Sequence, residues 1–301
     1  IATDATGASI LPLPSNPPKH QPCRRGHFFV LLADRDHVLF EYMPHENGPA
    51  IAQMLRGYSG YLQADAKSVY DILYRLPTHP DDGECIEVAC WAHARRRFYE
   101  AAITKSKLAR EALFRIQRLF ANEQQWAELP PQQRAALRQR HSKPELDAFF
   151  NWVEAEYDNV HHQRGLLRSA FGYAKRQRQA LCRYLDDGRL RMDNNPSESE
   201  LRRVVLGQNA FLFFGSDDHA QAAANLYSLI ASCRLHHLDP EAYLRDVLRV
   251  LPHRPRSRFL ELAPKYWART KACLNLAQLA KPAGQLDIPP PLHSTQQPST
   301  C

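Results

Sequence analysis

The sequence predicts an α/β protein: a mixed sheet flanked by helices, interrupted by a long all-helical segment and followed by a helical extension. Three observations predict this fold class. Short apolar runs bounded by polar turns fill most of the first 90 residues. Amphipathic helical patterns replace them from about 94 to 186, and further helical patterns continue to about 251. Strands and helices in this order indicate a sheet with helices packed on its faces.

The composition is that of a folded protein. Hydrophobic residues make up 44% of the 301 residues and aromatic residues 10%, which excludes a disordered chain. The chain has no run of about eighteen apolar residues, so we expect no membrane span. It begins at Ile1 without an initiator Met and without a secretory pattern, and we interpret it as a fragment or processed form of a longer protein.

The charge balance favours an acidic partner. Lys and Arg number 39 against 32 Asp and Glu, giving a net charge of +7, and the pI is about 9.1. Nucleic acid is therefore the first partner to consider. The seven cysteines are scattered and odd in number, which indicates a reducing compartment and no disulfide framework.

The first 93 residues are expected to supply most of the sheet. Residues 1–11 form a strand that carries Asp4, and a proline-rich loop follows at 12–22. Two further apolar runs separated by a short polar turn predict a hairpin. The two hairpin strands are expected at 27–33 and 38–42. After them we expect a helix at 49–56, a strand at 58–64 that ends at Asp65, a helix at 69–76 and a strand at 85–90.

The rest of the chain is expected to be helical. We predict that 1–93 and 187–251 are two parts of one core, separated by a helical insertion at 94–186. Residues 252–301 then form a C-terminal extension. Its end is rich in proline and loses helical periodicity after about 270, so we expect a disordered tail.

Three carboxylates are candidates for a shared site. Asp4 lies in the first strand and Asp65 follows another, so the two converge if these strands are neighbours. Glu198, at the start of a helix, would complete a three-carboxylate site. Such a site can hold two divalent cations about 4 Å apart for phosphoryl transfer, and Mg²⁺ prefers such oxygen ligands. The alternative for each aspartate is a turn or cap residue.

Glu198 has a structural alternative of its own. Asn195 is a good N-cap, Pro196 suits the first helical position, and Glu198 stands where a capping box has its carboxylate. Taken alone, this stretch favours the capping box. The two upstream aspartates make metal binding the better interpretation, and the helix start can then serve to aim Glu198 at the sheet.

Several long motifs in the right order resemble the transposase of insertion-sequence family sixty-six, over nearly all of residues 1–251. They are GYLQAD (60–65), ACWAHARRRFYEA (89–101), DDGRLRMDNNPSESELR (186–202), FLFFGSD (211–217) and YSLIASCRLHHLDPEAYLRDVL (227–248). The resemblance implies an RNase H-like core of the DDE class, which cuts and joins DNA strands in the bacterial cytoplasm. It implies two Mg²⁺ ions, with Mn²⁺ as a substitute, held by the catalytic residues Asp4, Asp65 and Glu198. The implied partners are transposon-end and target DNA, further copies of the chain on that DNA, and accessory transposition proteins.

The resemblance also assigns supporting residues. Cys90 and His93 match a Cys-x-x-His element of several DDE transposases, in which His93 would orient or stabilise the active-site edge. Asn194, Asn195 and Arg202 flank the proposed catalytic glutamate. Zinc is the alternative for Cys90 and His93, but they supply only two ligands, because Cys85 would face the other side of a regular strand.

One departure from the family pattern concerns the helix that carries Glu198. The family usually has Arg directly after the glutamate, where this chain has Ser199. Loss of that Arg would weaken a phosphate contact or an ion pair while leaving the three carboxylates in place. A second hypothesis is therefore a catalytically inactive or truncated transposase remnant that binds DNA. A third is a nuclease or junction resolvase on the same fold.

Basic residues follow the strand at 85–90. Arg95, Arg96, Arg97, Lys105 and Lys107 are expected to contact DNA phosphates, and a second basic concentration lies between 164 and 191. The alternative for both is a solvated helix face. Trp126 and Trp152 are expected to be core residues and not to stack on bases.

Overall fold

The computed structural model describes residues 1–12, 23–33, 36–75, 83–161 and 165–274. A five-stranded sheet has the order β3-β2-β1-β4-β5. β1 pairs with β4 and β4 with β5 in parallel, whereas β2 and β3 are antiparallel. The predicted mixed sheet and the predicted hairpin are therefore confirmed. The strands are β1 (Ala2–Ile10), β2 (Arg24–Ala33), β3 (His37–Met43), β4 (Gly60–Ala64) and β5 (Cys85–Ala89).

The chain divides into two compact units. The first unit contains Ile1–Asp4 and His45–Ser199, and the second contains Ala5–Pro44 and Glu200–Cys301. Their limits fall inside β1 and inside the helix α8 (Asn195–Phe211). Each unit is described separately.

Helices make up most of the first unit, in agreement with the helical pattern of its sequence. Several begin at expected signals: Asn47 caps α1 and Ser106 caps α3 through their side chains. These helices are α1 (Gly48–Met54), the 3₁₀-helix η1 (Ser68–Tyr74), α2 (Trp91–Ile103), α3 (Lys107–Gln125), α4 (Pro131–Leu137), the π-helix η2 (Arg138–Ser142), α5 (Lys143–His161), α6 (Leu166–Arg176), α7 (Arg178–Cys182) and the 3₁₀-helix η3 (Arg183–Leu185).

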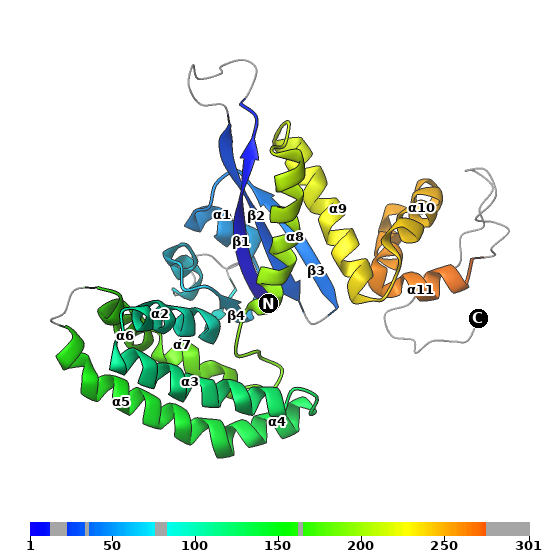
Figure 1. Ribbon diagram of the computed structural model, residues 1–301. Coiled ribbons are helices and arrows are strands. Elements are labelled where there is room, and N and C mark those ends of the chain that lie inside the picture. The colour runs from blue at the N-terminus through cyan, green and yellow to red at the C-terminus, as the bar shows by residue number, and fades with distance from the viewer. Residues whose placement is uncertain (13–22, 34–35, 76–82, 162–164, 275–301) are drawn as a thin grey trace. The chain divides into compact units, whose positions relative to one another are not determined.

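The core of the first unit is aromatic. α2 packs against α3 and α6, and α5 packs against α3 and α6, so that α3 and α5 run side by side (Figure 1). Trp91 is fully buried and donates from Nε1 to the Leu181 carbonyl at 2.8 Å. Trp126 is buried and Trp152 packs against the same core, as the sequence favoured. Within this helical body, α2 carries His93 of the candidate site.

In the second unit, a long helix covers the β2–β3 hairpin. α9 (Asp217–Leu235) lies along β3, where the hydroxyls of Ser228 and Ser232 accept hydrogen bonds from the Phe40 and Val38 backbone N–H groups at 2.7 and 3.3 Å. A smaller core around Trp267 follows. It is formed by α10 (Pro240–Val250), η4 (Leu251–His253), η5 (Arg256–Leu262) and α11 (Pro264–Ala272).

Two sequence-based predictions concern residues outside the described part of the chain. The proline-rich loop falls there from residue 13 to 22, and the disordered tail falls there from residue 275. Across the part of the chain that is described, none of the helices is sufficiently long and apolar to cross a membrane.

Candidate active site

The parallel pairing of β1 and β4 places Asp4 and Asp65 at the same level. Ala2 is in register with Gln63, whose N–H donates to the Ile1 carbonyl at 2.9 Å. Asp4 lies on β1 two residues beyond that pair, and Asp65 lies two residues beyond it, directly after the end of β4. Neighbouring strands are about 4.8 Å apart, and equivalent positions of parallel strands face the same side. The first unit therefore brings together the two aspartates that the sequence selected.

The negative charge around these aspartates affects the pKa of Tyr70 on η1. Burial is the first cause of its raised pKa, and the negative charges of Asp4, Glu46 and Asp65 raise it further. Glu46 itself pairs with Lys67 at 3.0 Å. Sequence reasoning did not select Tyr70, Glu46 or Lys67, and only the closeness of Lys67 to Asp65 in sequence could have drawn attention to them.

His93 lies between the second aspartate and the glutamate. Its Nε2 atom is 3.7 Å from Asp65 Oδ2 and 3.7 Å from Glu198 Oε1. His93 is on the first turn of α2, directly after β5, and Glu198 is on the first turn of α8. One imidazole nitrogen thus faces two of the three proposed carboxylates, each of which is partly exposed to solvent.

Asn194 fixes the start of the helix that carries Glu198. It is fully buried, its backbone N–H donates to Cys90 Sγ at 3.2 Å, and its side-chain amide donates to the Thr3 carbonyl at 2.8 Å. Its own carbonyl accepts the Glu198 N–H at 3.3 Å. The residues before Asp4, before α2 and before α8 are therefore joined through this one asparagine.

The capping-box alternative for Glu198 is wrong. Asn195 is the first residue of α8, and its backbone N–H and side-chain amide donate to Asp193 Oδ1 and Oδ2 at 3.2 and 2.9 Å. The Glu198 N–H goes to the Asn194 carbonyl instead. The Glu198 carboxylate is thus not needed to close the helix start, and it faces His93.

Cys90 has the properties of a structural thiol. It is fully buried, and burial raises the pKa of its thiol to about 11, so at neutral pH it is protonated and accepts the Asn194 N–H. Nowhere in the described ranges do three or more His, Cys, Asp or Glu side chains form a group that could hold a metal ion. The carboxylates are therefore brought to one edge without forming a closed coordination group.

The donor atoms at this edge suit a hard divalent cation better than zinc. Asp65 and Glu198 offer carboxylate oxygens, and their side chains are 21% and 40% exposed, which leaves room for water and substrate oxygens. Around them, His93 Nδ1, Asn194 Oδ1 and Ser197 Oγ are buried without a hydrogen-bond partner in the described chain. Buried polar atoms in this state indicate a place for water or a ligand.

The five basic residues assigned to DNA differ in their surroundings. Arg95, Arg96, Lys105 and Lys107 are exposed, and Arg96 contacts Glu100 at 3.3 Å. Arg97 is half-buried, with its guanidinium 4.5 Å from the Tyr173 ring centre. Four of the five are thus exposed, although Arg96 is paired with Glu100 and Arg95 lies 5.8 Å from the centre of the Phe120 ring, and the fifth is packed into the protein.

Other predicted residues lie at the edges of this site or outside it. Ser199 is exposed directly after Glu198, and Arg202 is exposed on the part of α8 that belongs to the second unit. In the second basic concentration, Lys175 pairs with Glu154 at 2.7 Å and Arg189 with Asp187 at 2.6 Å. Those two cations are therefore already engaged within the chain.

Comparison with known proteins assigns the sequence to a family. The profile of the family described as "Transposase IS66 family" matches residues 1–222, and that of the "IS66 C-terminal element" matches residues 228–264. No solved structure matches the chain.

The curated relatives are uncharacterized proteins of Sinorhizobium fredii (strain NBRC 101917 / NGR234). Protein y4hP is 33% identical over 234 residues, covering 72% of this chain and 41% of its own length. Protein y4qI is 30% identical over 230 residues, covering 75% of this chain and 42% of its own length. The chain therefore spans about two fifths of the length of the relatives that it matches.

Proposed function

Because the chain belongs to the IS66 family of transposases, we propose that it carries the DDE catalytic core that cuts and joins DNA strands at transposon ends. The core is proposed to be RNase H-like. Three successive strands followed by helix, strand, helix and strand support this assignment, as does the strand order β3-β2-β1-β4-β5. The insertion is proposed to span residues 94–186, which contain most of α2 and the helices from α3 to η3.

One observation carries the proposal. Asp4 on β1 and Asp65 directly after β4 both lie two residues beyond the register pair of these parallel strands, and His93 Nε2 is 3.7 Å from each of the Asp65 and Glu198 carboxylates. Residues far apart in sequence are thus brought together in the order strand, strand and helix that the family motif requires. A capping or turn role for any one carboxylate does not account for this convergence.

Each residue has a proposed part in the reaction. The carboxylates of Asp4, Asp65 and Glu198 are proposed to hold two Mg²⁺ ions, or Mn²⁺ in their place. When bound, such a pair activates the attacking water or 3′-hydroxyl and stabilises the leaving oxygen. His93 orients the Asp65 and Glu198 carboxylates through Nε2, and Asn194 holds the helix start that presents Glu198.

The DNA is proposed to run along exposed cations next to the site. Arg95 and Arg96 on α2 and Lys105 and Lys107 at the α2–α3 junction are suited to phosphate contacts, which are electrostatic and independent of base sequence. The proposed setting is the bacterial cytoplasm, with transposon ends, target DNA, further copies of the chain and accessory transposition proteins as partners.

The test is nicking of a labelled transposon-end duplex in Mg²⁺ or Mn²⁺. Asp65→Asn and Glu198→Gln should each abolish nicking, because each removes one charged oxygen ligand and keeps the side-chain shape. Glu200→Gln is the matched control, since Glu200 pairs with Arg203 at 3.2 Å and should be dispensable. Undiminished nicking in both test variants would overturn the proposal, and products of hydrolysis without strand transfer would favour a nuclease or resolvase.

A catalytically inactive DNA-binding remnant is the second candidate. Ser199 in place of the usual arginine favours it, as does the lack of a closed metal-binding group among the described residues. Titration of Mn²⁺ into the chain and into Glu198→Gln distinguishes the two functions. Mn²⁺ binding that is lost in Glu198→Gln supports the enzyme. A chain that binds DNA and shows no Mn²⁺ binding dependent on Glu198 supports the remnant.

A further inference from the structure

Two buried arginines in the first unit contact the segment that leads to Glu198. Arg134 on α4 is 8% exposed, and Arg138 at the start of the π-helix η2 is fully buried. A buried guanidinium is unfavourable unless its charge and its N–H groups are satisfied. The groups that satisfy these two arginines therefore show what they hold in place.

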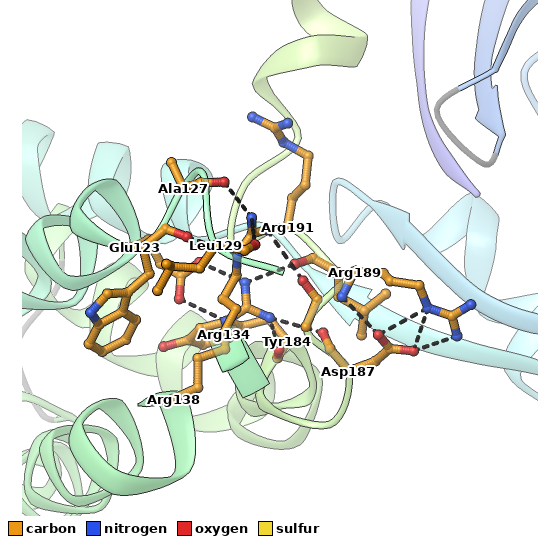
Figure 2. A network of polar contacts seen from close by, with 12 residues as sticks. Glu123, Ala127, Leu129, Arg134, Arg138, Tyr184, Asp187, Arg189 and Arg191 are labelled. Carbon is orange, nitrogen blue, oxygen red and sulfur yellow. Dashed lines mark hydrogen bonds and ion pairs between the residues drawn. The ribbon is translucent and has the colours of Figure 1, made fainter. Parts of the chain in front are cut away.

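Arg138 uses all five of its N–H groups. Two go to the Glu123 carboxylate, from Nε at 2.8 Å and from Nη2 at 2.6 Å. The other three go to main-chain carbonyls of Tyr184 at 2.6 Å, Asp187 at 2.9 Å and Leu190 at 2.9 Å (Figure 2). One side chain thus binds the backbone at three points from Tyr184 in η3 to Leu190 before α8. We call residues 184–194 the return segment.

Arg134 and Gly188 add a second attachment of the return segment. Arg134 donates to the Gly188 carbonyl at 3.3 Å and to the carbonyls of Trp126 and Leu129 at 3.2 and 3.1 Å. A Cβ atom at Gly188 would lie 1.8 Å from the carbonyl oxygen of Pro131, so only glycine allows this approach. The return segment therefore packs backbone against backbone on the start of α4.

The later part of the return segment is attached to the sheet. Gln63 donates from its side chain to the Arg191 carbonyl at 2.9 Å, and the Trp91 N–H donates to the Met192 carbonyl at 3.0 Å. Asn194 then binds Cys90 and Thr3. The return segment is thus held by α4 and η2 at its beginning, and by β1, β4 and the junction of β5 with α2 at its end, four residues before Glu198.

We propose that Arg138 and Arg134 are positioning residues for Glu198, which they act on by holding the return segment. The proposal rests on the metal-binding role proposed for Glu198. The planar guanidinium of Arg138 fixes three carbonyls at defined angles and also lies 5.0 Å from the centre of the Tyr184 ring, so each of its contacts apart from Glu123 is to the return segment. Mutation of a residue that orients a metal ligand without binding the metal itself commonly lowers the affinity for the metal.

The test uses the full chain and the Arg138→Met variant, which keeps much of the volume and removes the donors. We expect the concentration of Mn²⁺ for half-maximal nicking to rise about tenfold, while the KM for DNA is unchanged. Amide exchange without metal should become at least about tenfold faster in residues 184–194 and unchanged in α5 residues 147–160. Arg118→Met, which removes an exposed contact to Glu145, is the matched control and should change neither quantity.

A purely structural role predicts a different result. It lowers the fraction of folded enzyme and speeds exchange equally in α5 and the return segment, without changing the Mn²⁺ requirement, and that outcome would overturn the proposal. If Arg138→Met does not fold, Arg134→Met and Gly188→Ala address the same attachment and are read in the same way. Wild-type chain without metal-dependent nicking would refute the proposed function, and the exchange result would still decide whether the arginines hold the return segment.

Discussion

The side-chain amide of Asn194 donates to the main-chain carbonyl of Thr3 at 2.8 Å, although 191 positions separate them in sequence. Thr3 precedes Asp4, and the backbone of Asn194 bonds to Cys90, the residue before the helix of His93. Asn194 therefore connects three of the four chain segments that carry the proposed site, those of Asp4, His93 and Glu198, and it touches none of the carboxylates in these contacts.

Asn194→Ala tests this joining role, because it removes the connecting hydrogen bond of the side chain and leaves the three carboxylates unchanged. Because the change removes a buried hydrogen bond and leaves the Thr3 carbonyl without its donor, we expect the free energy of unfolding to fall by about 1–3 kcal/mol. Nicking should fall with it, since Glu198 loses its fixed helix start. Urea unfolding and the nicking assay measure the two effects.

Asn195→Ala is the control for this change. Asn195 is exposed and bonds only locally to Asp193 in the contacts described above, so we expect an effect within about 0.5 kcal/mol. Equal effects of the two alanine substitutions would contradict the joining role of Asn194.

The sequence predicted the strands and helices well because their patterns are local. Alternating or continuous apolar runs placed β1 to β5 within a few residues, and the two aspartates were recognised from their positions at strand ends. The capping box was wrong because the Asn195 N–H donates to Asp193 and not to Glu198, a choice of partner that the composition of the helix start does not reveal.

The remaining features depend on contacts between distant segments. Nothing in the local sequence distinguishes Arg138, which is fully buried, from Arg96, which is exposed, because arginine is ordinarily a surface residue. The nearness of Tyr70 to Asp4 likewise follows from the folding of η1, and no motif signals it.

His93 is expected to matter through the orientation of two carboxylates. His93→Ala removes the group 3.7 Å from both Asp65 and Glu198, so the nicking rate at fixed Mg²⁺ should fall about 10- to 100-fold. His93→Gln retains a donor of similar reach and should recover part of that rate. An alanine variant with wild-type activity across a Mg²⁺ titration would show that His93 has no such role.

The arginines of α2 should divide into two classes. Replacing exposed Arg95 and Arg96 with Ala should reduce the slope of log affinity for DNA against log salt by about 0.9 for each phosphate that is no longer neutralised. Arg97→Ala should leave this slope unchanged and lower the free energy of unfolding by about 0.5–2 kcal/mol, because it removes the interaction with Tyr173. Fluorescence anisotropy over a range of salt concentrations, together with urea unfolding, measures both. If the slope of log affinity against log salt is unchanged or steeper in the double variant, Arg95 and Arg96 do not contact DNA phosphates.

Ser199→Arg introduces the residue that the resemblance to the transposase family leads us to expect directly after Glu198. Ser199 is exposed, so the larger side chain should be accommodated with a change in unfolding free energy below about 0.5 kcal/mol. If the arginine contacts a phosphate, the salt slope of DNA binding should increase by about 0.9 and nicking should rise. Ser199→Gln adds length without charge and serves as the control, since an equal gain in both variants would exclude a phosphate contact.

Cys90 should make the fold sensitive to alkali. Burial raises the pKa of its thiol from 9.0 to about 11, so the folded chain holds this proton more tightly than the unfolded chain does. The thiol therefore contributes its full share of the unfolding free energy below about pH 9 and loses that share as the pH rises to about 11. A difference of this size corresponds to about 2–3 kcal/mol.

Cys90→Ser tests this contribution, because a serine hydroxyl does not titrate in this range and can still accept the Asn194 N–H. Urea unfolding of the variant between about pH 7 and about pH 11, a range that brackets the ordinary thiol pKa, should show a shallower loss of stability than the wild-type chain. Burial also raises the pKa values of Cys182 and Cys233 to about 11, and both remain in the two proteins, so only the difference between the curves is attributed to Cys90. Parallel curves would mean that the Cys90 thiol is not held protonated by the fold, and the structural role assigned to it beside Asn194 would then be wrong.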